Sequence, residues 1–126
     1  MATVSYVLDT TVLIDHLRDH AAATAWLLAL PTRPMSSEVT RAEVIGGLRS
    51  SERASAERLF AAMDWIAVDE AVSRLAGDLG RRYRRSHVGL GTADLLIAAT
   101  AIDQGAKMAT SDVRHFPMFR GLKPPY

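Results

Sequence analysis

The chain has 126 residues, of which 48% are hydrophobic and 23% are charged, and it contains no cysteine. These values are typical of one soluble globular domain, and they exclude disulfide bonds and thiolate metal sites. The net charge of +1 combines a balance of −4 over residues 1–80 with a balance of +5 over residues 81–126. A basic C-terminal third suits a phosphate-bearing partner, although a solvated helix face explains the same charges equally well.

The N-terminus lacks a basic segment followed by an apolar core and a small-residue cleavage site, so it does not resemble a signal peptide. The longest nearly apolar run, ADLLIAATAI, is too short to cross a bilayer. We therefore expect a cytoplasmic protein with no membrane partner, folded as a single domain over residues 1–126.

Strands and helices are predicted to alternate along the chain. The segment TVSYVLD (residues 3–9) is β-branched and aromatic, which indicates a strand buried on both faces. Thr10 or Thr11 can cap the helix that follows it. The first half is thus predicted to contain a strand, two helices, an extended segment and two further helices, over residues 3–9, 10–20, 21–30, 33–37, 37–51 and 51–63.

The second half continues the same alternation. It is predicted to contain a strand, an increasingly basic helix, a loop, an apolar helix and a short strand, over residues 64–69, 70–86, 87–91, 92–105 and 107–112. This order of elements favours an α/β fold with a parallel sheet covered by helices on both faces.

Four carboxylates stand at or near the ends of these elements. Asp9 ends the first strand, Asp112 ends the last, and Asp94 lies in the first turn of the apolar helix. Glu43 lies in a helix, on the side that is expected to face the core. Ligands of parallel sheets bind beyond the carboxyl ends of the strands. Asp103 is excluded from a site with Asp94, because nine helical residues separate them by about 180° and roughly 13.5 Å.

Each carboxylate taken alone also has a structural explanation. Asp9 can cap a helix, and Asp94 can stabilise a helix dipole. Glu43 can be an exposed charge, and Asp112 can form a turn. Four carboxylates that share one crevice repel each other unless a cation is bound, and oxygen ligands without His or Cys suit Mg²⁺ or Mn²⁺.

Several segments together resemble one protein family. They are YVLDTTVLIDHL, TRAEVIGGL, GTADLLIAATAIDQGAKMATSDVRHF and GLKP, which occur in this order over essentially the whole chain. With these segments the chain resembles the PIN-domain ribonucleases, and most closely the VapC-type toxins of bacterial toxin–antitoxin pairs.

The resemblance implies a PIN-like three-layer α/β/α sandwich with a central, mainly parallel sheet. It also implies an acidic site, in which Asp9 and Asp94 are the main metal ligands and Glu43 holds the metal or orients the attacking water. Many relatives have Asn in place of Asp112, so this residue is expected to act through water or a second ion. The complete set of implied site residues, including two supporting hydroxyls, is Asp9, Glu43, Asp94, Asp112, Thr11 and Thr110.

The activity implied by the resemblance is Mg²⁺-dependent hydrolysis of RNA phosphodiester bonds, with Mn²⁺ as a substitute. The implied partners are the RNA substrate, a small VapB-type antitoxin and a second copy of the chain in a homodimer. Basic residues in the C-terminal third are candidates for RNA phosphate contacts or, alternatively, a solvated face. They are Arg81, Arg82, Arg84, Arg85, Arg114 and His115.

Other functions remain open from the sequence. A housekeeping RNA-processing PIN nuclease and a non-catalytic PIN-fold binding module share the same segments. A haloacid-dehalogenase-like phosphatase is disfavoured, because it needs a second Asp two residues after the first and Thr11 stands there. The apolar residues Leu48, Leu59, Phe60 and Met63 can form either an antitoxin groove or ordinary core.

Overall fold

The computed structural model describes residues 4–126. Thr3, at which the first strand was predicted to begin, lies outside the described residues. Within them the sheet has four parallel strands in the order β3-β2-β1-β4. Each strand is three residues long: β1 Tyr6–Leu8, β2 Met35–Ser37, β3 Asp64–Ile66 and β4 Lys107–Ala109.

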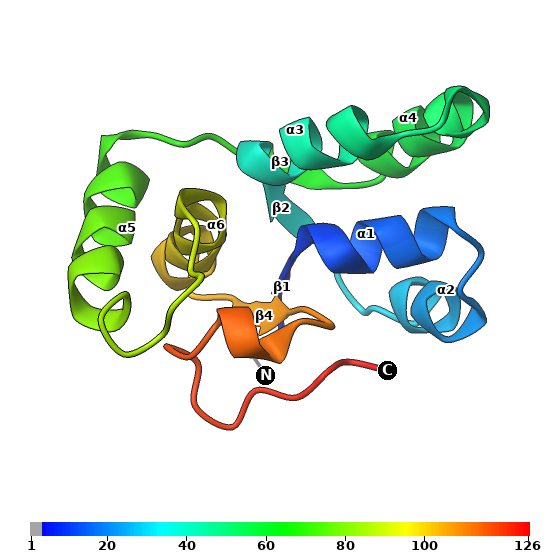
Figure 1. The fold of residues 1–126 in the computed structure, drawn as a ribbon. Coiled ribbons are helices and arrows are strands. Elements are labelled where there is room, and N and C mark those ends of the chain that lie inside the picture. The colour runs from blue at the N-terminus through cyan, green and yellow to red at the C-terminus, as the bar shows by residue number, and fades with distance from the viewer. Residues whose placement is uncertain (1–3) are drawn as a thin grey trace.

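The helices cover the sheet on both sides. Figure 1 shows α5 and α6 on one side of the sheet and α1 and α2 on the other, with α3 and α4 at the β3 end. The predicted α/β/α sandwich is therefore confirmed. The helices are α1 Thr10–Leu17, α2 Ala21–Leu28, α3 Glu38–Gly47, α4 Arg53–Ala61, α5 Glu70–Tyr83 and α6 Thr92–Asp103, with short 3₁₀ turns η1 Ser50–Glu52 and η2 Val113–His115.

Two hydrophobic clusters hold the layers together. Val7 and Met108 belong to the cluster beneath α5 and α6, whereas Leu8 and Ala109 belong to the cluster on the other face. Successive strand residues point to opposite faces of a sheet, so a strand that is apolar at every position is buried on both. This accounts for the unbroken apolar run before Asp9.

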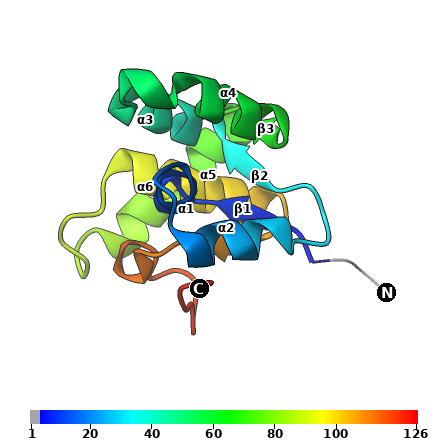
Figure 2. The ribbon, with the colours of Figure 1, turned by 90° about the vertical axis from the view of Figure 1, so that its right-hand side faces the viewer.

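The elements end earlier than the sequence pattern predicted. The helix expected over residues 10–20 ends at Leu17, and Asp19 adopts a left-handed φ of 61°. The helix expected over residues 37–51 ends at Gly47, because Leu48 is extended. The N-cap position of α1 is occupied by Asp9. The predicted caps, Thr10 and Thr11, lie inside the helix. Figure 2 shows α1 almost end-on, beside β1.

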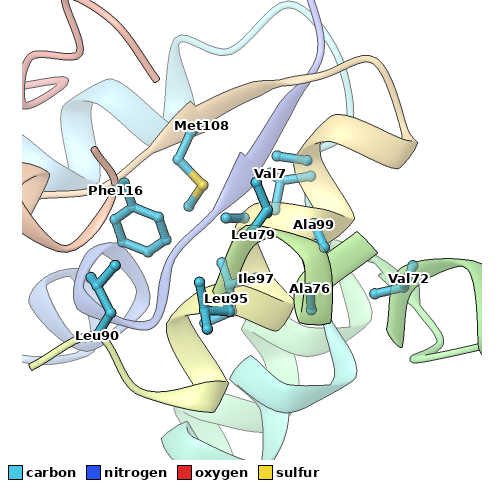
Figure 3. Packing of buried hydrophobic residues seen from close by; sticks show 12 residues of the cluster. Val7, Val72, Ala76, Leu79, Leu90, Leu95, Ile97, Ala99, Met108 and Phe116 are labelled. Atoms are coloured by element: carbon cyan, nitrogen blue, oxygen red, sulfur yellow. The ribbon is translucent and has the colours of Figure 1, made fainter. Parts of the chain in front are cut away.

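The core also anchors two segments near the C-terminal end of the sheet. Leu90, just before α6, and Phe116, just after η2, are 7% and 1% exposed. Figure 3 shows both at the same end of the cluster, beside Leu95 and Met108. The start of α6 and the η2 turn are therefore fixed by packing. None of the helices in residues 4–126 has the length and apolar character needed to cross a membrane.

Candidate active site

Asp9 is held at the carboxyl end of the central strand. Strands β1 and β4 are adjacent, with Leu8 opposite Ala109, so the next residues, Asp9 and Thr110, emerge side by side. The Asp9 backbone N–H donates to the Ala109 carbonyl at 2.8 Å. The Asp9 side chain is buried and forms no capping bond to α1. Instead, its Oδ2 accepts hydrogen bonds from the hydroxyls of Thr110 at 2.8 Å and Thr11 at 3.1 Å.

The same two hydroxyls accept hydrogen bonds from the loop after β4. The Asp112 N–H donates to Thr110 Oγ1 at 2.9 Å, and the Ser111 N–H donates to Thr11 Oγ1 at 3.2 Å. Each threonine thus links a backbone amide of this loop to the Asp9 carboxylate. The arrangement fixes the Asp9 carboxylate and places Asp112 beside it.

Glu43 reaches the site from α3. Its side chain is exposed, which differs from the core-facing side expected from the sequence. The Thr10 hydroxyl donates to Glu43 Oε1 at 2.6 Å, and the buried Thr40 hydroxyl lies 3.4 Å from Thr10 Oγ1. From the sequence, Thr10 was predicted only as a helix cap. Its position next to Asp9 was the one available signal that it belongs to the site.

His115 connects the remaining two carboxylates. Its Nδ1 lies 3.3 Å from Asp94 Oδ2 and 3.2 Å from Asp112 Oδ2. His115 was predicted as a candidate RNA phosphate contact, whereas in the structure it lies between two acidic side chains. Asp103, which the helical geometry excluded, is exposed in the last turn of α6.

Burial raises the pKa of the Asp9 carboxyl above its ordinary value of 3.8. Hydrogen bonds from Thr110, from the Thr10 backbone and from Thr11 oppose this rise in pKa, in that order. The charge of Glu43 adds to it. Desolvation therefore outweighs the hydrogen bonds that favour the ionised carboxylate.

The pKa of Asp94 is also raised, first by burial and then by the charges of Asp9 and Glu43. Only His115 and a backbone N–H counteract these effects. Asp9, Glu43 and Asp94 thus lie close enough to repel one another. The site holds more negative charge than its protein surroundings compensate.

The donor chemistry of this site fits a hard divalent cation. Within residues 4–126 no three His, Asp or Glu side chains are gathered into a ready metal cage. Carboxylate oxygens are nevertheless the ligands that Mg²⁺ and Mn²⁺ prefer, and a cation would favour the ionised forms of Asp9 and Asp94, which burial and neighbouring charges disfavour.

The arginines of the α5 end differ in their relation to the site. Arg84 donates to the Thr92 hydroxyl at 3.0 Å, two residues before Asp94. The Arg82 guanidinium lies over the Tyr83 ring, 5.4 Å from its centroid. Arg81 and Arg85 are exposed, and within residues 4–126 neither forms an ion pair with the acidic residues. Arg114 is exposed between Asp112 and His115 in sequence.

The apolar residues considered for a partner groove divide into two groups. Phe60 and Met63 are 4% and 3% exposed and belong to the core, whereas Leu48 and Leu59 are half-buried around it. A groove of about 680 Å³ lies between α2 and α4 and is partly lined by Leu59 and Met63. Leu28, on its α2 wall, is 81% exposed.

Known proteins resemble this chain in sequence and in fold. The family model described as PIN domain matches residues 6–120. Ribonuclease VapC19 of Mycobacterium tuberculosis is 46% identical over 123 residues, covering 95% of this chain and 98% of the relative. Ribonuclease VapC10 of the same organism is 48% identical over 122 residues, covering 95% and 92%. A chain of a toxin–antitoxin complex from Klebsiella pneumoniae superposes with a TM-score of 0.82 at 25% identity, covering 97% of this chain and 98% of that one.

The fold and the family match define a PIN domain. The chain therefore belongs to the PIN-domain family and, within that family, to the VapC-type ribonucleases.

The raised pKa of Asp94 predicts how its charge affects stability. A folded-state pKa above the unfolded one means that this carboxyl lowers stability as pH rises from about 4 through the folded pKa, and the loss persists at neutral pH. In chelator at pH 7, Asp94→Asn should melt about 2–4 °C above wild type, and the difference should shrink towards pH 4. Adding Mg²⁺ at about ten times its dissociation constant should stabilise wild type by roughly 1.4 kcal/mol and the variant by less.

The matched control for this prediction is Asp103→Asn, an exposed carboxylate on the same helix. It should respond to pH and Mg²⁺ as wild type does. A wild type indifferent to metal, together with an Asp94→Asn variant that melts lower in chelator, would falsify the convergent charge cluster.

The 2.6 Å hydrogen bond from Thr10 predicts a role in orienting Glu43. Thr10→Val removes the hydroxyl and nearly preserves the side-chain shape, so it should reduce ribonuclease activity about five- to tenfold. Thr10→Ser keeps the donor and should restore most of the rate. Activity measured against Mg²⁺ concentration checks this, and equal rates for Val and Ser variants would show that the hydroxyl is irrelevant.

Proposed function

We propose that this protein is a metal-dependent endoribonuclease that acts as the toxin of a toxin–antitoxin pair. The observation that carries the proposal is the meeting of Asp9, Glu43 and Asp94 in one mutually repelling cluster, at the carboxyl end of a parallel sheet. The likeness to ribonucleases VapC19 and VapC10 supports the ribonuclease activity. A site that retains its carboxylates gives no support to a non-catalytic binding module.

Four carboxylates are the proposed holders of the cation, which is Mg²⁺, with Mn²⁺ as a substitute. Asp9 and Asp94 are the main ligands, Glu43 holds the ion or orients water, and Asp112 acts through water or a second ion. When bound, Mg²⁺ lowers the pKa of a coordinated water and polarises a phosphoryl oxygen. The Thr11 and Thr110 hydroxyls keep the Asp9 carboxylate in one orientation, which a metal ligand requires.

The proposed reaction is hydrolysis at phosphorus. Oxygen of water forms a bond to phosphorus and the bond from phosphorus to the ribose O3′ breaks. The leaving oxygen takes up a proton, so the products carry a 5′-phosphate and a 3′-hydroxyl. Glu43 suits the task of orienting this water, because its carboxylate is exposed towards solvent while Thr10 restrains it.

The proposed protein partner is a small VapB-type antitoxin, which the likeness to a chain of the Klebsiella pneumoniae toxin–antitoxin complex supports. The groove between α2 and α4, with the exposed Leu28 on its wall, offers apolar surface for such a segment. A homodimer in the cytoplasm is the expected working form. The basic residues of the α5 end and of η2 are candidate contacts for the RNA backbone.

Substitution of single carboxylates distinguishes the proposed metal ligands from a carboxylate outside the site. Asp9→Asn and Asp94→Asn should lower the rate of RNA cleavage at least about a hundredfold, because each removes a charged oxygen ligand. Asp103→Asn should retain the wild-type rate within about twofold. The measurement is single-turnover cleavage of RNA in Mg²⁺, with the 5′-phosphate ends captured by ligation. Equal losses at Asp94 and Asp103 would show that the site is misassigned.

The toxin role predicts a growth phenotype with a remedy. Expression of the chain alone in bacteria should arrest growth, and co-expression of the neighbouring small antitoxin gene should restore it. Expression of Asp94→Asn should permit growth at the same protein level, which an immunoblot verifies. Unimpaired growth at high levels of folded, RNA-cleaving wild-type protein would instead favour the housekeeping nuclease.

A further inference from the structure

A second pocket adjoins the acidic site on the far side of His115. Its volume is about 620 Å³, within the range of small-ligand sites. One wall comes from the loop between α5 and α6, through His87, Val88 and Leu90, and the other comes from η2, through Arg114 and His115. Because His115 also contacts Asp94 and Asp112, the pocket and the acidic cluster share one wall.

The chemistry of this pocket is opposite to that of the acidic site. None of the residues that line it is acidic. The Arg114 side chain is exposed, and within the described part of the chain it forms no hydrogen bond or ion pair. The lining also contains two imidazole rings, of His87 and His115, and apolar side chains, of which Val88 is 98% exposed. The Arg114 cation suits a phosphate, and the imidazole rings and the Val88 side chain suit a base attached to that phosphate.

We propose that this pocket receives one unstacked nucleotide of single-stranded RNA, next to the phosphodiester that is cut. The inference rests on the ribonuclease function proposed above and adds a substrate position to it. Arg114 binds a phosphate oxygen, His87 offers a ring on which the base stacks, and Val88 contacts the nucleotide from the loop. Proteins read single-stranded RNA through splayed bases stacked on aromatic or His rings, with Arg on the backbone.

Charge decides between RNA and a protein occupant. The acidic cluster attracts a basic side chain, but this neighbouring pocket repels one because Arg114 lies in its wall without a carboxylate partner. An RNA strand satisfies both regions, since the phosphate beside Arg114 is anionic. The walls are also preformed, because the buried Leu90 and Phe116 anchor the loop and η2 (Figure 3). Little ordering is therefore required on binding.

The first test uses charge removal at matched positions. A fluorescein-labelled single-stranded RNA decamer of random sequence is titrated, in Mg²⁺, into full-length protein carrying Asp9→Asn to prevent cleavage. Arg114→Gln should weaken binding about five- to tenfold. Arg120→Gln removes an equally exposed arginine, which lines a pocket at the opposite ends of β1 and β4, and it should change binding less than about twofold. Equal losses at the two positions would overturn the pocket in favour of general attraction.

The second test addresses the ring and the loop. His87→Ala should weaken binding about fivefold, whereas His87→Phe, which keeps a stacking surface, should restore it. Val88→Glu should weaken binding by repelling phosphate, and Ala54→Glu introduces the same charge at an exposed position in the first turn of α4 as its control. Because Val88 and Ala54 are exposed, both variants should keep the wild-type melting temperature. Equivalent effects of Val88→Glu and Ala54→Glu would exclude a specific pocket.

Cleavage kinetics distinguish failure of this inference from failure of the proposed function. In the otherwise native protein, Arg114→Gln should raise KM about five- to tenfold and leave kcat within about twofold. Wild-type protein that cleaves RNA while Arg114→Gln and His87→Ala have native KM values would overturn the nucleotide pocket alone. Unchanged RNA binding with weakened antitoxin inhibition would assign the pocket to the protein partner and overturn the inference too. Wild-type protein without RNA cleavage would reject the function itself.

Discussion

The burial of one carboxylate at the end of the central strand constrains the rest of the structure. Asp9 is 4% exposed, and a carboxylate in such a place requires hydrogen-bond donors from the protein. Two threonine hydroxyls donate to its Oδ2, one from α1 and one from the residue after β4. The register of β1 against β4 brings these groups together, so the order of the strands and the chemistry of the site are a single arrangement.

The four carboxylates are not equivalent in their surroundings. Asp9 is bound by hydroxyls, Glu43 by the hydroxyl of Thr10, and Asp94 and Asp112 by the ring of His115. Hydroxyls orient a carboxylate without neutralising it, so the cluster keeps its charge. Binding sites commonly lower the stability of a protein, because a site whose charges the protein itself neutralises would bind its ligand weakly. The raised pKa values of Asp9 and Asp94 reflect charged forms that the protein does not fully stabilise.

Much of this fold was predictable because the relevant signals are local. The apolar run before Asp9 indicates a strand buried on both faces, and the almost wholly apolar helix that contains Asp94 indicates a buried helix. The contacts that complete the site are long-range and were not predictable. Thr10 contacts Glu43, which lies 33 residues away in the sequence, and His115 of η2 contacts Asp94 of α6. The side of α3 that carries Glu43 was misjudged, because the helix packs through Thr40 and Val44 and leaves Glu43 at the edge. Hydrophobic periodicity does not predict that a polar residue such as Thr40 lies on the buried face of a helix.

The hydrogen bond from Thr110 to Asp9 joins residues 101 positions apart in the chain. During synthesis the N-terminal strand therefore leaves the ribosome long before β4, its neighbour in the sheet, has been translated. A nascent chain without residues 107–112 has neither β4 nor the loop amides that the two threonines bind. The acidic site is consequently assembled last, when the chain is nearly complete. A growing polypeptide that lacks these residues therefore has no complete acidic site while it is still being synthesised.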